Sequence, residues 1–308
     1  MKIAVMRLWM LLLGVMCIAA TCEKPVELGL PLPDPKLVVV SNFTTGEAMR
    51  VRVSRSRSIL DDSPEDYIAD AVVELFNEDD QFIEQLNLVI PQINRVSPYY
   101  TTQGTAFVPG ETYKLKVSAA GFEPVTSNSA IPPRIQIQQF SVSGLTSGPG
   151  SQPGSVRYDY QVSLSFSDPG AQTNYYHLNF FQEVQDIIVE QSYLQPVVFS
   201  PFTDNNYLLA YFAGGVLIED EPFNGQTISY TFPMSIEIYP SYQLLGKIYV
   251  ELRTTSEEYY LFHNSLSRQQ TNNSGTNGEP IFIYNNIENG HGIFAGYSFS
   301  LDSLNVIN

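Results

Sequence analysis

The stretch SVRYDYQVSLSF, residues 155–166, decides the fold class of this chain. Its apolar and aromatic side chains recur at every second position, and polar or charged residues fill the positions between them. This alternation is typical of a β-strand with one buried face, because successive side chains of a strand point to opposite faces of the sheet. The predicted buried face carries Val156, Tyr158, Tyr160, Val162, Leu164 and Phe166.

The first hundred residues after the N-terminal region repeat this pattern in shorter pieces. MRVRV (49–53) and YKLKV (113–117) place apolar residues on one face and basic residues on the other. AVVELFNEDDQFIEQL (71–86) predicts a hairpin that turns at residues 77–80. Several short strands in this space predict an immunoglobulin-like β-sandwich over residues 36–132.

The adjacent Pro132 and Pro133 interrupt the strand pattern and mark the predicted boundary between two domains. Residues 134–308 contain further alternating segments, so we expect a second and larger β-sandwich there. The predicted fold class is therefore all-β, with two sandwiches.

One helix, at about residues 256–270, is expected within the second sandwich. Thr255 and Glu258 have the spacing of a capping box at its start. Its apolar stripe at helical spacing consists of Tyr259, Phe262, His263 and Leu266.

The N-terminus has the organisation of a secretory signal over residues 1–21. Lys2 and Arg7 come before an uncharged run (8–20) that is too short to span a bilayer as a helix. Cys22 follows small residues in a way that resembles the lipobox of bacterial lipoproteins, whose cysteine is acylated and becomes the first residue of the mature protein. The alternative is plain secretion with one unexplained thiol.

Residues 22–35 hold four prolines and no periodicity, which predicts a lipid anchor followed by an extended tether. Several acyl chains would hold the protein firmly at a membrane. We therefore expect a lipid-anchored protein of the outer membrane, on the cell surface.

The composition excludes some classes of partner. The chain has 16 Lys and Arg against 32 Asp and Glu, a net charge of −16, and the predicted signal removes two of the basic residues. Such a surface repels nucleic acid and anionic lipid headgroups.

The sequence lacks the usual motifs of zinc proteolysis, serine hydrolysis, thiol redox chemistry and nucleotide binding. We therefore expect no enzymatic activity and no cofactor. The histidines predict no metal site, because His263 lies in the apolar helical stripe, His177 alternates onto the polar side of a strand, and His291 lies between two glycines in a loop. The acidic turns at 77–80, 203–206 and 219–221 are predicted to be solvated rather than to bind calcium, since none has the spacing of an EF-hand loop.

A cluster of basic residues stands out in this acidic chain: Arg50, Arg52, Arg55 and Arg57. Two interpretations are open. The residues are either the solvent face of one strand or a docking stripe for an acidic partner.

Segments along the whole mature chain resemble those of one known family: CEKPVEL, PKLVV, VPGETYKLKV, FSDPGAQTNYY, EDEPFNGQTISY and PIFIYNNIENGHGIFAGYS. The family comprises uncharacterised surface lipoproteins of Bacteroidetes-type bacteria and is known only as a domain of unknown function. Its most specific piece is NNIENGHGIFAGYS (285–298), whose glycines fit turn positions next to a strand, with a binding loop as the alternative.

The resemblance implies a partner, because genes of this family often lie beside those of TonB-dependent outer-membrane transporters. The leading hypothesis is a non-enzymatic lipoprotein that assists such a transporter. The alternatives are a structural or adhesive envelope protein, and an enzyme with an unfamiliar site. Contacts are expected from two loops, since loops on a rigid scaffold usually carry recognition. Besides the four arginines, the predicted contact residues are Asp204, Asn205, Asn206, Tyr207, Asn289 and His291.

Overall fold

The computed structural model describes residues 34–58, 61, 63–92, 96–197, 208–211, 215–272 and 281–307. The strands and the helix named below lie in one compact unit, Pro35–Asn308. The predicted signal peptide, Cys22 and nearly all of the tether lie outside the described residues.

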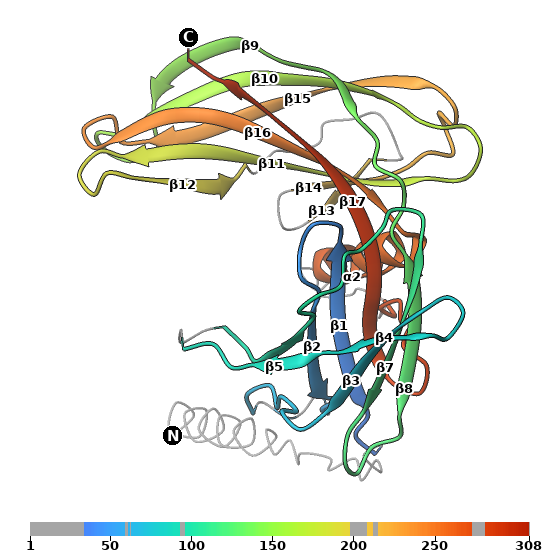
Figure 1. The fold of residues 1–308 in the computed structure, drawn as a ribbon. Helices are drawn as coiled ribbons and strands as arrows, with labels where there is room; N and C mark the ends of the chain where they lie inside the picture. Colours follow the sequence, from blue (N-terminus) through green and yellow to red (C-terminus); the bar gives the residue numbers. More distant parts are fainter. Residues whose placement is uncertain are drawn as a thin grey trace, which may run out of the picture. The chain divides into compact units, whose positions relative to one another are not determined.

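Within the described residues, the largest sheet has ten strands (Figure 1). Along the sheet the order is β13 (Leu208–Tyr211), β14 (Gly215–Glu219), β11 (Tyr175–Asp186), β16 (Gln243–Thr255), β17 (His291–Asn305), β1 (Leu37–Thr44), β2 (Arg50–Arg55), β6 (Tyr99–Thr101) and β5 (Asn87–Val89), and β12 (Gln191–Pro196) pairs with β11 outside this path.

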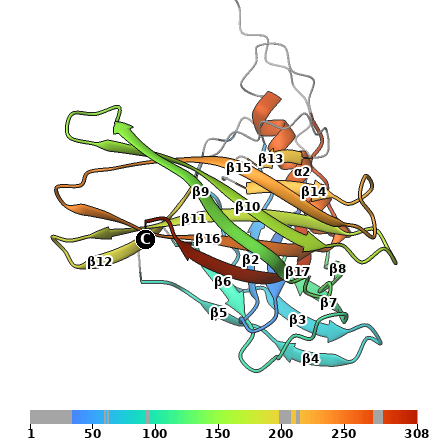
Figure 2. The same cartoon turned by 90° about the horizontal axis from the view of Figure 1, so that it is seen from above.

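Two smaller sheets cover different parts of the large one. The first contains β15 (Thr227–Ile238), β10 (Val156–Ser167) and β9 (Ile137–Pro149), in that order. The second contains β4 (Phe82–Gln85), β3 (Val72–Asn77), β7 (Thr112–Ser118) and β8 (Val125–Ala130). Figure 2 shows β9, β10 and β15 lying over β11 and β16. The predicted all-β sandwich fold is confirmed, and the described residues contain one helix.

The alternating stretch that predicts the fold class forms β10, and it places its apolar side as expected. Tyr160, Val162, Leu164 and Phe166 are buried, whereas Arg157 and Gln161 are exposed. The four buried side chains of β10 pack against β11 and β16 in one hydrophobic core. The alternation along β10 thus predicted correctly which face of this strand is buried between the two sheets.

A second core lies between β1 and β2 on one side and β3, β7 and β8 on the other. It also contains Ile287 and Phe294, which are distant in sequence from its other members. The predicted division of the chain at Pro132 and Pro133 remains a prediction, but side chains from the last 25 residues complete the core that residues 37–131 begin.

Strand β17 is what joins the two halves of the large sheet. Its first part pairs with β1 in parallel, from Val38 opposite His291 to Thr44 opposite Tyr297. Its second part pairs with β16 in antiparallel fashion, from Thr255 opposite Tyr297 to Lys247 opposite Asn305. The sheet is therefore continuous from one sandwich to the other.

The helix α2 (Glu257–Asn272) covers part of the large sheet and contacts β17, β11 and β13. Its N-cap is Ser256 rather than the predicted Thr255, because the Ser256 Oγ accepts the hydrogen bond of the Tyr259 N–H at 3.3 Å. Thr255 is still part of β16 and is buried beside β17. The capping-box prediction was wrong by one residue, since the strand continues further than the local sequence indicates.

The described part of the chain has no helix whose length and hydropathy would allow it to cross a membrane.

Candidate functional site

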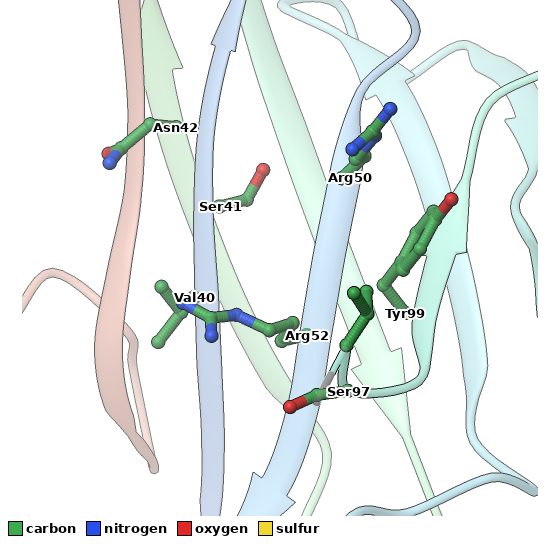
Figure 3. Close-up of a pocket in the computed structure, with 8 residues that line it drawn as sticks. Val40, Ser41, Asn42, Arg50, Arg52, Ser97 and Tyr99 are labelled. Carbon is green, nitrogen blue, oxygen red and sulfur yellow. The ribbon is translucent and has the colours of Figure 1, made fainter. Parts of the chain in front are cut away.

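A surface pocket of about 410 Å³ lies beside β1 and β2, on the face of the large sheet that is turned away from the second core. We call it the arginine pocket. Its lining residues are Val40, Ser41, Asn42, Arg50, Arg52, Val96, Ser97 and Tyr99 (Figure 3).

The strand alternation of β2 places Arg50 and Arg52 in this pocket. Val51 and Val53 point into the second core, so both arginine side chains emerge on the opposite face and are exposed. The guanidinium carbon of Arg50 lies 5.1 Å from the centre of the Tyr99 ring, a cation–π contact that orients the side chain. Arg52 reaches from β2 across to Val40 on β1 (Figure 3). The two charged groups consequently lie at different ends of the pocket.

Within the described part of the chain, neither Arg50 nor Arg52 takes part in an ion pair. An arginine with no carboxylate partner keeps its five N–H donors for water or for a ligand. In a chain with twice as many acidic as basic residues, two neighbouring arginines without a carboxylate partner among the described residues are a local exception.

The other two arginines of the predicted stripe do not line the pocket. Arg55 forms an ion pair with Asp66, with 2.7 Å between the Arg55 Nε and a carboxylate oxygen. Arg57 is exposed beyond the end of β2, where its charge helps to lower the pKa of Asp61, although hydrogen bonds from Ser63 have the larger effect on that carboxyl. The structure therefore divides the stripe into two pocket arginines and two that serve local contacts.

The inner wall of the pocket is part of β1. Ser41 is 2% exposed, and its hydroxyl has no hydrogen-bond partner among the described residues. Asn42 points away from Arg50 and Arg52 in Figure 3, and its amide nitrogen lies 3.3 Å from the Nε2 of His263 on α2. Asn42 thus connects the pocket to the residues under the helix.

Those residues form a buried polar group that we call the histidine cluster: His177, Glu251, Arg253, Tyr259 and His263. His177 lies on the side of β11 opposite the apolar Tyr176 and Leu178, as its alternation predicts, but this side is covered and His177 is only 3% exposed. The physical reason is that β11 is covered on both faces, by the first core on one side and by α2 on the other. The ring centres of His177 and His263 lie 6.3 Å apart.

The histidine cluster is held together by hydrogen bonds and one ion pair. Both terminal nitrogen arms of Arg253 are engaged, because the guanidinium makes two bonds to the Glu251 carboxylate, at 2.9 and 3.1 Å, and one to the Tyr259 hydroxyl at 2.9 Å. The same hydroxyl lies 2.9 Å from the Nδ1 of His177. Arg253 also lies over the ring of Tyr297, at 4.6 Å from its centre.

Burial keeps both histidines neutral. It lowers the pKa of His177 well below the ordinary value, with smaller contributions from the Arg253 and His263 charges. Burial, assisted by Arg253, lowers the pKa of His263 to about 4. No three His, Cys, Asp or Glu side chains among the described residues are grouped so that they could hold a metal ion.

A model of the protein family named Domain of unknown function (DUF4249) matches residues 23–301. This chain belongs to the DUF4249 family. No curated protein matches it.

Three solved structures match this DUF4249 chain distantly, with TM-scores too low to carry an argument. A pullulanase complexed with maltotriose from Anoxybacillus sp. LM18-11 matches at 6% identity and a TM-score of 0.20, over 70% of this chain and 24% of that one. This chain therefore spans about a quarter of the pullulanase. The C-terminal domain of the Streptococcus pyogenes antigen I/II-family protein AspA matches at 7% identity and 0.16, over 74% and 96%. The Enterococcus faecalis MSCRAMM ACE matches at 7% and 0.15, over 85% and 93%.

The terminal segment of the DUF4249 chain makes many bonds within the protein. The side-chain amide of Asn286 bonds both backbone groups of Phe294, donating at 2.7 Å to its carbonyl and accepting at 3.0 Å from its N–H. Gly292 has a φ of +118°, and a Cβ at this position would collide with the carbonyl oxygen of Val39. Gly292 lies within β17 opposite Val39, so it allows a close approach of the segment to β1 rather than forming a turn, and the turn interpretation does not hold for this glycine.

The predicted contact residues of this segment lie near its turn. Asn289 has a φ of 63°, and its side chain lies 3.5 Å from the carbonyl oxygen of Pro124. His291 is exposed at the first position of β17. Neither residue lines the arginine pocket, so the structure does not bring them together with Arg50 and Arg52. The other predicted loop, with Asp204, Asn205, Asn206 and Tyr207, lies outside the described residues.

One of the acidic turns is not solvated as predicted. Asp220 is 0% exposed, and one of its carboxylate oxygens accepts the backbone N–H of Asn174 at 2.7 Å. Burial raises its pKa, and the neighbouring charge of Asp168 adds to this effect. Asp80, in contrast, is exposed and pairs with Lys114 at 2.8 Å. The sequence could not separate the two turns, because only the packing of β11 and β14 encloses Asp220.

Proposed function

We propose that this chain is a lipid-anchored protein of the outer membrane that binds a TonB-dependent transporter as an accessory partner. In this proposal Cys22 carries the lipid, residues 23–35 serve as the tether, and the β-sandwich unit presents a recognition surface. The N-terminal sequence supports the anchor, and the gene neighbourhood typical of the family that the sequence resembles supports the partner.

The observation that carries the binding role is the arginine pocket. Its lining provides positive charge from two arginines, polar groups from serine and asparagine, and apolar surface from valine and tyrosine. Arginine and tyrosine are the residue types that contribute most to recognition at protein interfaces. A guanidinium with no carboxylate partner among the described residues can bind a carboxylate with two parallel hydrogen bonds.

A structural or adhesive role without a transport link is the second candidate. It is favoured by an apolar hairpin tip at the end of β11, where Ile187, Ile188 and Val189 are 44%, 73% and 58% exposed. Leu244 on β16 is also exposed, at 49%, and the tip is attached to the β15–β16 turn by a hydrogen bond from Ile187 to Tyr242. Contiguous exposed apolar residues of this kind mark interaction sites.

Affinity purification of the tagged protein from detergent-solubilised outer membranes tests the proposed function. The native protein should recover a β-barrel transporter, and the Arg50→Gln/Arg52→Gln variant should recover much less of it. Arg55→Gln is the matched control, because this arginine comes from the same strand but pairs with Asp66. Failure to recover any transporter, with the barrel known to be expressed, would overturn the proposal.

The anchor is tested separately by mass spectrometry of the native protein. We expect an acylated N-terminal Cys22, and we expect Cys22→Ala to leave an uncleaved or soluble precursor. An unmodified thiol next to a free amine would contradict the lipid anchor.

A further inference from the structure

The arginine pocket has features that narrow the chemistry of its occupant. Arg50 and Arg52 are two residues apart on one face of β2, so their Cα atoms are about 6.6 Å apart at the usual rise of about 3.3 Å per residue. Alternate side chains of any extended peptide have the same spacing. The backbone positions of the pocket arginines therefore have the same spacing as two acidic residues at positions i and i+2 of an extended segment.

The direction of the two side chains argues against a single small anion. A site for one phosphate or one carboxylate would need guanidinium groups that converge on the same point. Figure 3 shows the opposite arrangement, with Arg52 extended towards Val40 and the head of Arg50 on the side of Tyr99. Two separated cations favour a ligand with two separated negative groups.

Both arginines are also partly ordered before any ligand binds. Arg50 lies against the Tyr99 ring, and the long stem of Arg52 lies along the apolar surface next to Val40. Side chains that are already placed lose less conformational entropy on binding. The exposed Val96 adds apolar surface to the lining of the pocket.

We infer that the arginine pocket binds an extended acidic peptide segment of a partner protein, with carboxylates at alternate positions paired to Arg50 and Arg52. This inference deepens the proposed function and rests on its binding role. The inference specifies the chemical nature of the partner's segment and names the residues that bind it. The acidic character of the rest of the chain contributes to specificity, because it repels acidic segments that do not align with the two arginines.

Peptide binding to the full-length protein in detergent tests the inference directly. The probe is a fluorescent hexapeptide with glutamate alternating with threonine, and its binding is followed by fluorescence polarisation at low salt. The same peptide with glutamine in place of glutamate should bind at least about tenfold more weakly. A peptide with glutamates at positions 1, 2 and 5 and threonines elsewhere should also bind more weakly, because no two of its carboxylates are two residues apart.

Variants assign the binding to the pocket. Arg50→Gln and Arg52→Gln should each weaken binding of the alternating peptide about tenfold, and Arg55→Gln should leave it unchanged. All three arginines are exposed, so the variants are expected to fold, which thermal unfolding verifies. Equal effects of Arg50→Gln and Arg55→Gln would overturn the inference. Displacement of the peptide by inorganic phosphate at comparable affinity would also overturn it, because this would show a single-anion site.

The two proposals can fail separately. If the peptide binds as expected but no transporter is recovered from membranes, the inference stands and the transporter proposal fails. If wild type and the Arg50→Gln/Arg52→Gln variant recover a transporter equally well, the accessory role stands and the inference fails.

Discussion

The arginine pocket and the histidine cluster lie on the same face of the large sheet, but they differ in whether their arginines are paired with carboxylates. Under α2, Arg253 is bonded to Glu251 and Tyr259. Beyond the helix, Arg50 and Arg52 are exposed and form no ion pair with any described residue. Asn42 touches both regions, since it lines the pocket and contacts His263.

The difference follows from the cost of burying a charge. A guanidinium under the helix would be destabilising without a carboxylate and hydrogen-bond acceptors around it. A guanidinium in contact with water has no such requirement, so it can remain unpaired until a ligand arrives. A covered charge is thus part of the fold, whereas an uncovered pair of charges is available for recognition.

The largest expected effect comes from removing the covered arginine. Arg253→Met leaves the buried Glu251 carboxylate without its partner and should lower the free energy of unfolding by about 4 kcal/mol. Arg50→Met in the pocket should change it by less than about 0.5 kcal/mol. Urea denaturation followed by circular dichroism measures both.

The double variant Glu251→Gln/Arg253→Met should cost less than the two single variants together, because it removes the unpaired charge. Equal costs for Arg253→Met and Arg50→Met would refute the distinction between the two regions.

A smaller effect is expected from pH. Unfolding returns His263 to an ordinary pKa of about 6.5 from its folded pKa of about 4, so the unfolded state binds more protons within this window. The contribution of His263 to the free energy of unfolding should therefore be fully present above about pH 6.5. It should fall by about 3 kcal/mol as the pH drops towards 4. His177 should act in the same direction, because burial also lowers its pKa. Arg253 faces both rings, and its positive charge opposes their protonation.

His263→Leu isolates this contribution. Its cost at pH 7.5 should be no more than about 1.5 kcal/mol, because leucine is of similar size and the buried site already excludes water. Between pH 6 and 5, the fall in unfolding free energy should be about 1.4 kcal/mol per pH unit shallower than in the wild type. An unchanged slope would show that His263 is not kept neutral by burial.

The smallest effect concerns the start of the covering helix. Ser256→Ala removes the N-cap of α2 and should lower the free energy of unfolding by about 1 kcal/mol. Thr255→Val is the matched control, because the Thr255 hydroxyl is buried without a hydrogen-bond partner among the described residues and valine has a similar shape. We expect this control to be neutral or slightly stabilising in thermal unfolding. A larger loss from Thr255→Val than from Ser256→Ala would restore the capping box at Thr255.

Local periodicity in the sequence was sufficient for the all-β class and for the faces of β10 and β2. Alternation alone placed Leu164 and Phe166 inside, and it placed Arg50 and Arg52 together outside. The helix could also be predicted, because its apolar stripe repeats over several turns. These features depend on neighbours within a few positions, which is the range over which a sequence pattern acts.

The sequence by itself determined the all-β class, the helix near residues 256–270 and a pair of arginines on one strand face. Only the tertiary structure decided that β17 joins both sandwiches, that His177 is covered by α2, and that Asp220 is enclosed while Asp80 is not. It also decided that Arg50 and Arg52 line a pocket whereas Arg55 pairs with Asp66. The reason is physical. Burial and ion pairing depend on contacts between segments that are far apart along the chain, and a local sequence pattern does not predict which of these segments come into contact.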